Sequence, residues 1–340
     1  MTRLLALSAT AALLAGVASA QTITINSFGG AYEEAHRACV LDRFTEETGA
    51  EVEIVTAYSA DGFAQLRAQA AAPQYDVIHF SGGQEIVAAQ EGLLSPIDPA
   101  MLTNAADLVE VARPNLEGGE GPAYSIVALG LVYNQEALET SPTSWTDLTK
   151  PEYAGNMVLT DISNTYGLQG FLMLNQVMGG DLTDIQPGLD AVSAMLEGGA
   201  IVVSTSPEIM QEFSQNDAWI APYSSDYAFT LREAGMPVAM AQGSEGTPGV
   251  FITANLVAGR ENQELATKLI DISISPEAQA CWAERMRYAP TNTKVELTGD
   301  VAADTPFGEA ALSGLLRFDP ATIEANRPAW TDAWNRTIAR

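Results

Sequence analysis

The sequence predicts an α/β protein of two lobes, each a mainly parallel sheet flanked by helices, with hinge strands joining them. Three observations support this prediction. Strand-like and helix-like segments alternate along the chain. Two strands run directly into a glycine turn followed by a helix, at Gly29-Gly30 and at Gly82-Gly83, as parallel sheets with right-handed crossovers require. About 320 residues remain after an N-terminal export signal, enough for two domains of ordinary size.

The export signal is predicted at residues 1–20. Arg3 gives a positive start, residues 4–17 form an apolar segment, and residues 18–20 are the small residues that a signal peptidase accepts. The apolar segment is too short for a stable membrane span. We therefore expect an exported chain that begins at Gln21.

The first lobe is expected to begin with strand–helix units in sequence. The predicted elements are a strand from residue 21 into the first glycine turn, a helix at 31–48 closed by Gly49, a strand at 51–55, a helix at 63–72 ended by Pro73, a strand at 75–80 and a helix at 84–91. Ligands bind outside the carboxyl ends of such parallel strands, and both glycine turns fall there.

The second lobe is entered and left by apolar strands. Residues 126–133 are predicted to cross into it and residues 250–258 to return, with four strands between them at 156–161, 200–205, 218–223 and 237–242. Helices follow at 261–274 and 276–287, and Trp330 with Trp334 should anchor a final helix in the core. This assigns residues 21–126 and 250–298 to the first lobe, and residues 127–249 and 299–340 to the second.

Composition excludes several kinds of partner. The net charge is −27, from 43 acidic and 16 basic residues, so neither nucleic acid nor an anionic membrane surface is expected as a partner. In an oxidising compartment, Cys39 and Cys281 are expected to form a disulfide. His36 and His79 show no metal-ligand spacing, so we expect neither a metal nor a cofactor.

Five short segments carry a resemblance to a known family. They are SFGGAY at 27–32, YDVI with SGG at 75–83, SWTDL with PEYAGN at 144–156, SPEAQ at 275–279 and YAPTN at 288–292. In this order they resemble segments of the extracellular solute-binding proteins of ABC transporters, in the group of spermidine/putrescine-binding proteins and their iron- and thiamine-binding relatives.

The resemblance implies a fold and a role. It implies the two-lobed clamshell of type 2 periplasmic binding proteins, which closes about a hinge over one small molecule. It also implies a periplasmic protein without catalytic residues that docks on a membrane permease, and we expect a monomer. The chain lacks a Walker-type phosphate loop, consistent with a separate ATPase.

Candidate ligand-binding residues lie at the expected strand ends. The glycine turns offer backbone N–H groups and hydroxyls, aromatic side chains would wall the pocket, and two carboxylates would set its polarity. Asp226 is either a partner for an ammonium group or a helix N-cap, and Asp161 either faces the ligand or belongs to an ordinary turn. The candidates are Ser27, Phe28, Gly29, Gly30, Tyr32, Ser81, Gly82, Asp161, Tyr223, Asp226 and Phe251.

The chain departs from the polyamine-binding pattern at three positions. Where polyamine binders carry carboxylates, this sequence has Ile162, Thr165 and Thr253. A diamine needs an anion at each end, because a buried unpaired ammonium is costly. The expected solute is thus small and amine-containing. A solute with one amine and one acid group, or a neutral polar one, fits the missing carboxylates better than a diamine. An exported α/β enzyme and a ligand-sensing subunit of a membrane receptor remain alternatives.

Overall fold

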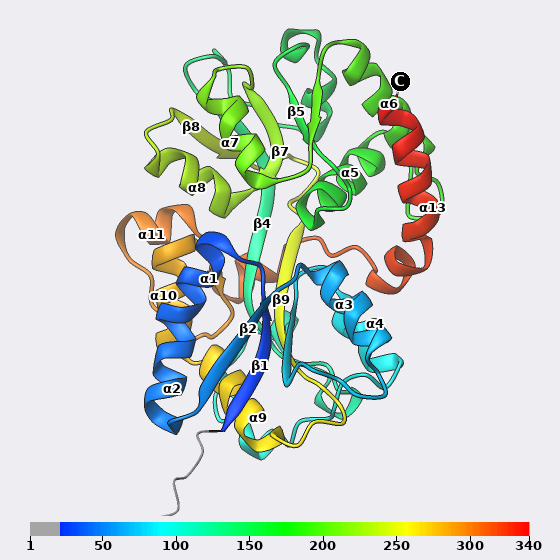
Figure 1. Cartoon of the computed structure of the whole chain (residues 1–340). Helices are drawn as coiled ribbons and strands as arrows, with labels where there is room; N and C mark the ends of the chain where they lie inside the picture. The colour runs from blue at the N-terminus through cyan, green and yellow to red at the C-terminus, as the bar shows by residue number, and fades with distance from the viewer. Residues whose placement is uncertain (1–20, 340) are drawn as a thin grey trace, which may run out of the picture.

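The computed structural model describes residues 21–339 and arranges them in two lobes joined through the long strand β4 (Ala123–Asn134) (Figure 1). The predicted signal peptide lies outside the described residues. The first half of β4 belongs to the sheet of the first lobe and its second half to the sheet of the second lobe. This arrangement confirms the predicted α/β fold with two lobes, whereas the residue boundaries given for each lobe stay a prediction.

The sheet of the first lobe has the strand order β10-β4-β9-β3-β1-β2. Strands β1 and β2 run parallel with Ser27 opposite Thr56, and β3 is parallel to β1. The predicted parallel units are confirmed, but β9 enters antiparallel between β3 and β4, which periodicity alone does not encode. The remaining bounds are β1 Thr22–Ser27, β2 Glu51–Thr56, β3 Val77–Phe80, β9 Gly249–Leu256 and β10 Ala289–Pro290.

Helices flank this sheet, with α1, α2 and α10 on one side and α3 and α4 on the other (Figure 1). The helix expected at 31–48 is divided by a π-helical turn, η1, and ends as predicted at Gly49, whose φ of 70° few other residues adopt. The bounds are α1 Gly30–His36, η1 Arg37–Leu41, α2 Asp42–Thr48, α3 Ser59–Ala68, α4 Gln84–Gln90, α9 Gln263–Ser273 and α10 Pro276–Met286.

A disulfide ties the first of these helical runs to α10. Cys39 in η1 is bonded to Cys281, and their Cα atoms lie 5.5 Å apart. The predicted pairing is confirmed. The bond closes a loop over a sequence separation of 242 residues and lies one residue from Trp282, which is fully buried.

The second lobe is built on the upper half of β4, with β7 and β8 antiparallel to it. Strands β5 and β6 form a parallel pair beside them, so all four strands predicted between the crossings are confirmed. The sheets are mixed and not mainly parallel as expected, because both strands paired with β4 in this lobe run antiparallel to it. The bounds are β5 Val158–Thr160, α5 Thr165–Val177, α6 Gln186–Glu197, β6 Ile201–Val203, α7 Ser206–Ser214, β7 Ile220–Ser224, α8 Ser225–Glu233 and β8 Val238–Ala241.

Short turns make up most of the connections. The 3₁₀ turns are η2 Pro99–Met101, η3 Ala105–Asp107, η4 Glu110–Ala112, η5 Leu116–Gly118, η6 Trp145–Thr149 and η7 Pro151–Tyr153, and the last helices are α11 Gly299–Asp304, α12 Glu309–Ser313 and α13 Pro320–Ile338. Among residues 21–339, no helix combines the length and hydrophobicity needed to cross a membrane.

The C-terminal helix α13 packs against both α4 of the first lobe and α6 of the second. Trp330 and Trp334 are buried, which confirms their predicted role as anchors of this helix. The indole N–H of Trp334 donates to Oδ2 of Asp161 over 2.8 Å, and its ring contacts Phe171 edge-on. The carboxylate of Asp161 thus helps to hold α13 on the second lobe.

We expect Trp334→Phe to lower the free energy of unfolding by about 2 kcal/mol, the usual contribution of a hydrogen bond to a charged group. For a chain of this size, the melting temperature should fall by about 4 °C in a calorimetric scan. Trp330→Phe is the matched control, because it shortens another buried indole of α13, one helical turn earlier. An equal loss in both variants would attribute the effect to ring volume and not to the bond with Asp161.

Candidate ligand-binding site

Five tyrosines gather where the two lobes meet. Tyr32 and Tyr288 come from the first lobe, whereas Tyr166, Tyr223 and Tyr227 come from the second; we call these residues the tyrosine cluster. Burial first, and then the nearby Tyr166 and Asp226 of the second lobe, raise the pKa of Tyr288, so these groups lie close to one another across the boundary between the lobes. The cluster therefore lies at the boundary between the two lobes.

Aromatic packing fixes the first-lobe side of the cluster. The ring of Tyr288 stacks on Trp282 with centroids 5.4 Å apart, and Tyr32 lies 5.1 Å from the same indole. Phe28 packs on Tyr32 at 4.6 Å, and the hydroxyl of Tyr32 is hydrogen-bonded to that of Tyr124. These contacts hold the rings in place before any ligand arrives.

The second-lobe side is built from a strand end and the helix that follows it. Tyr223 is the last residue but one of β7, and Tyr227 lies in the first turn of α8. Their rings contact each other edge-on, with centroids 5.3 Å apart. Tyr166 packs edge-on against the other side of Tyr223, also at 5.3 Å. The hydroxyl of Tyr223 is hydrogen-bonded to that of Ser206 over 2.6 Å.

Asp226 is the charged group within this arrangement. It is the second residue of α8, whose N-cap is Ser224, so the structure does not give Asp226 the N-cap role that the sequence left open. Its side chain is buried, and Oδ1 has no hydrogen-bond partner among the described residues. Burial raises the pKa of Asp226 to about 6, since a charge is poorly solvated there.

The Asp226 carboxylate also influences the tyrosines. Burial first, and then the nearby Asp226 charge, raise the pKa values of Tyr166 and Tyr227 above the ordinary range. Both hydroxyls therefore stay protonated at neutral pH and remain available as hydrogen-bond donors. The site offers one carboxylate among neutral hydroxyls and aromatic faces.

The first glycine turn leads from β1 into α1. Gly29 and Gly30 have φ angles of 74° and 53°, which L side chains rarely adopt, and so this turn requires glycine. Ser27 is buried beneath the turn, where its Oγ accepts a hydrogen bond from the N–H of Gly29 over 3.2 Å. Phe28, the next residue, is partly exposed beside Tyr32.

The second glycine turn contributes hydroxyls that reach the other lobe. Ser81 is hydrogen-bonded to Ser59 through both its hydroxyl and its backbone N–H, each over 2.8 Å. Its hydroxyl also meets that of Thr165, the first residue of α5, at 3.5 Å. The N–H of Gly82 is already used, because it donates to Oε1 of Gln84 over 3.0 Å.

Two of the candidate residues lie outside this assembly. Asp161 accepts hydrogen bonds from the N–H of Ser163 and from Trp334, both over 2.8 Å. Phe251 packs in a separate apolar cluster with Ile126 and Leu312, and the guanidinium of Arg317 lies 4.6 Å from its ring centroid.

Several site residues were absent from the sequence-based candidates. They are Tyr124, Tyr227, Trp282, Tyr288 and Ser59. Tyr227 carried a usable signal, because its spacing of four from Tyr223 across a helix start brings both rings together. Tyr288 stood in a segment that carried the family resemblance. The others meet only through long-range packing.

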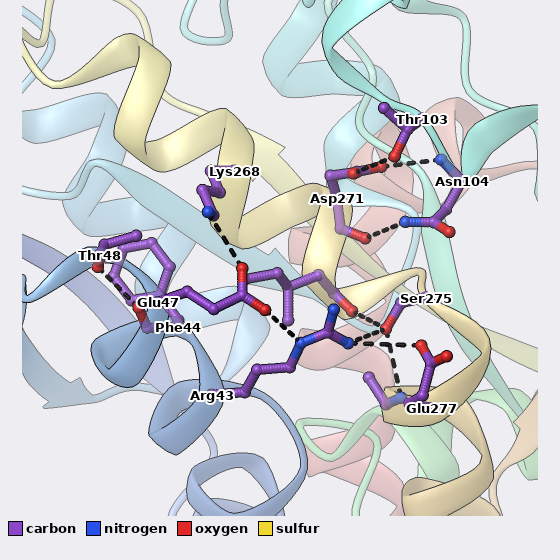
Figure 2. Close-up of polar contacts among 12 residues, drawn as sticks. Arg43, Phe44, Glu47, Thr48, Thr103, Asn104, Lys268, Asp271, Ser275 and Glu277 are labelled. Carbon is purple, nitrogen blue, oxygen red and sulfur yellow. Dashed lines mark hydrogen bonds and ion pairs between the residues drawn. The ribbon is translucent and has the colours of Figure 1, made fainter.

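An open cavity with a volume of about 930 Å³ lies elsewhere, at the outer end of the first lobe. Figure 2 shows that its charged side chains pair with one another: Glu47 lies between Arg43 and Lys268 at 2.7 and 3.1 Å. The carboxylate of Asp271 accepts from the hydroxyl of Thr103 over 2.7 Å. These groups are satisfied internally, so this groove is a weaker candidate than the tyrosine cluster. Among residues 21–339, no cluster of three metal-ligating side chains is present.

Comparisons with known proteins give a matching family and several relatives. A family model described as bacterial extracellular solute-binding protein matches residues 40–308. The spermidine/putrescine-binding periplasmic protein of Escherichia coli is 28% identical over 282 residues, which cover 78% of each chain. The gamma-aminobutyric acid-binding protein of Pseudomonas aeruginosa is 24% identical over 320 residues, covering 90% of this chain and 87% of the relative.

Solved structures show the same fold. An ABC transporter structure from Clostridium perfringens superposes with a TM-score of 0.77 at 22% identity, covering 93% of this chain and 99% of that one. A structure described as a GABA receptor superposes with a TM-score of 0.79 at 18% identity, covering 94% and 98%. At these identities the likeness is one of fold.

Proposed function

Because the chain belongs to the bacterial extracellular solute-binding proteins, we propose that it captures a small amine-containing solute between its lobes. The family consists of binding proteins, which sets aside the enzyme alternative. The proposed pocket is formed by Asp226, the tyrosine cluster and the turn at Gly29-Gly30. Hinge closure would bring the two halves of this pocket together around the solute.

The observation that carries the proposal is the carboxylate of Asp226. A buried charge is costly unless it is paired, and Oδ1 of Asp226 lacks a partner among the described residues. A primary ammonium group would supply both the opposite charge and the hydrogen-bond donors. The aromatic faces of Tyr223 and Tyr227, whose rings lie beside Asp226, suit the same cation.

The count of carboxylates favours a solute with one ammonium group. Asp161, the other acidic candidate, already accepts two hydrogen bonds from the chain itself. The first lobe, opposite Asp226, offers the hydroxyls of Ser59 and Ser81 and the start of α1 at Gly30, where backbone N–H groups attract a carboxylate. An ω-amino acid such as γ-aminobutyrate matches both ends.

The names of the relatives support this choice of chemistry. One relative is named for spermidine and putrescine and another for gamma-aminobutyric acid, and all three of these solutes carry a primary amine. We further propose that the chain is periplasmic and monomeric, with its predicted signal peptide removed, and that it presents the solute to the permease of an ABC importer.

Isothermal titration calorimetry on residues 21–340 tests the proposal with γ-aminobutyrate, putrescine, spermidine and glucose. We expect γ-aminobutyrate to bind about tenfold or more tightly than either polyamine, because a second buried ammonium would lack an anion. Tighter binding of putrescine would contradict the single-carboxylate argument. Binding of glucose with no response to any amine would contradict the proposal as a whole.

A further inference from the structure

Arg287 lies at the boundary between the lobes without belonging to the tyrosine cluster. It follows α10 and has φ 56°, the left-handed conformation that closes a helix. Its Nη1 donates to the carbonyl of Glu284 over 2.6 Å, which satisfies the end of α10. Only 9% of the residue is exposed, and it immediately precedes Tyr288 of the cluster.

The guanidinium of Arg287 reaches across to the second lobe. Its central carbon lies 4.0 Å from the ring centroid of Phe229 in α8, a cation–π contact between lobes. Its Nε lies 3.6 Å from Oδ2 of Asp304 at the end of α11, too long for a hydrogen bond, and this Nε has no other partner among the described residues.

Asp304 joins the two lobes through a second ion pair. Its Oδ2 also lies 2.7 Å from the guanidinium of Arg232, which extends from α8. One carboxylate thus stands between a cation of the first lobe and a cation of the second. Figure 1 shows α11 beside the end of α10 and beneath α8, in keeping with these distances.

We propose that Arg287, Asp304, Arg232 and Phe229 form an interlobe latch that stabilises the closed arrangement and thereby raises solute affinity. The latch acts on the equilibrium between the open and the closed arrangement of the lobes. Contacts that form only when the lobes are close together favour the closed arrangement. These side chains position the lobes; their effect on solute affinity rests on the function proposed above, whereas their effect on lobe separation does not.

Asp304→Asn is the most informative variant. It leaves side-chain volume nearly unchanged but removes the negative charge that separates Arg232 from Arg287, so that two cations face each other across the boundary. We expect the unliganded variant to scatter X-rays with a larger radius of gyration than the parent protein. Its dissociation constant for γ-aminobutyrate should rise about fivefold, as loss of partly exposed ion pairs allows.

Two further variants make the test specific. Phe229→Leu keeps an apolar residue but removes the cation–π contact, and should open the lobes in the same direction. Glu91→Gln breaks the 2.6 Å ion pair with Arg67 inside the first lobe and should change neither scattering nor affinity. In 0.5 M NaCl the difference between Asp304→Asn and the parent should shrink through screening.

Unchanged scattering in both Asp304→Asn and Phe229→Leu would overturn the latch. This outcome differs from failure of the proposed function, in which γ-aminobutyrate would not bind the parent protein at all. An equal opening in Glu91→Gln would also overturn it, because the effect would then follow from any lost ion pair.

Discussion

Replacing Asp226 with Asn is expected to weaken binding of an amine solute by about 100-fold or more. The solute's ammonium would lose its only charged partner in the proposed pocket, and removing one member of a buried hydrogen-bonded charge pair costs about 2–5 kcal/mol. Each 1.4 kcal/mol corresponds to a factor of ten in affinity. Titration calorimetry of both proteins with γ-aminobutyrate at pH 7.5 measures this loss.

The same variant should unfold at a higher temperature than the parent when no solute is present. The pKa of Asp226 is raised to about 6 in the folded protein, chiefly by burial, above its ordinary value of 3.8. The folded state therefore binds the proton more tightly than the unfolded state, and stability falls as pH rises from about 4 to 6. Above pH 6 the charged carboxylate lowers stability by up to about 3 kcal/mol, a penalty that Asn removes.

Two controls separate these effects from general disturbance. Asp217→Asn changes an exposed carboxylate of the same lobe and should alter neither affinity nor stability. Solute affinity of the parent protein should decline as the pH falls below 6, because a neutral carboxyl no longer attracts an ammonium, and the decline should be absent in Asp226→Asn. An affinity of the parent that stays constant from pH 7.5 to 5 would contradict the assignment of Asp226.

Loss of the disulfide is the second large expected effect. Replacing both Cys39 and Cys281 with serine should lower the free energy of unfolding by about 4–5 kcal/mol, because the bond closes a loop over a separation of 242 residues and restrains the unfolded chain. At this chain length the melting temperature should fall by about 8 °C in a calorimetric scan.

The same double variant should also bind the solute more weakly, by a smaller factor than Asp226→Asn. Cys281 precedes Trp282, and Tyr288 stacks on the indole of Trp282. Without the Cys39–Cys281 bond, α10 should hold the ring of Tyr288 less firmly. The parent protein treated with a thiol reductant provides the control, since it carries no substitution. A melting temperature unchanged by both treatments would show that packing of η1 on α10 already supplies the restraint.

The strands, their parallel pairing and the disulfide could be predicted because each leaves a local or compositional mark. Apolar runs end in glycine at Gly29 and at Gly82-Gly83, and the two cysteines had only each other as partners. The insertion of β9 between β3 and β4 left no such mark. Its pairs, such as Val77 with Leu256, join segments far apart in sequence, and the ladder is chosen by the packing of the whole lobe.

The site shows the same division. Tyr32, Tyr223 and Asp226 lie at or just after strand ends that the pattern places correctly, and their part in binding stays a prediction. Asp161 follows a strand end as well, yet its carboxylate is held by Trp334, a residue from the distant C-terminal helix. Phe251 was placed on the correct strand, but the side of the strand it occupies depends on Leu312 and the other apolar residues packed there.

The sharing of β4 has a consequence for how such proteins can be recombined. Ala123–Ala128 complete one sheet by pairing with β9, and Leu129–Asn134 complete the other by pairing with β7 and β8. A single crossover between two homologous genes at this strand would place β9 from one parent between β3 and β4 from the other, in the sheet of the first lobe. An exchange of whole halves would therefore have to preserve both ladders of β9, the one with β3 and the one with β4, for the first lobe to fold.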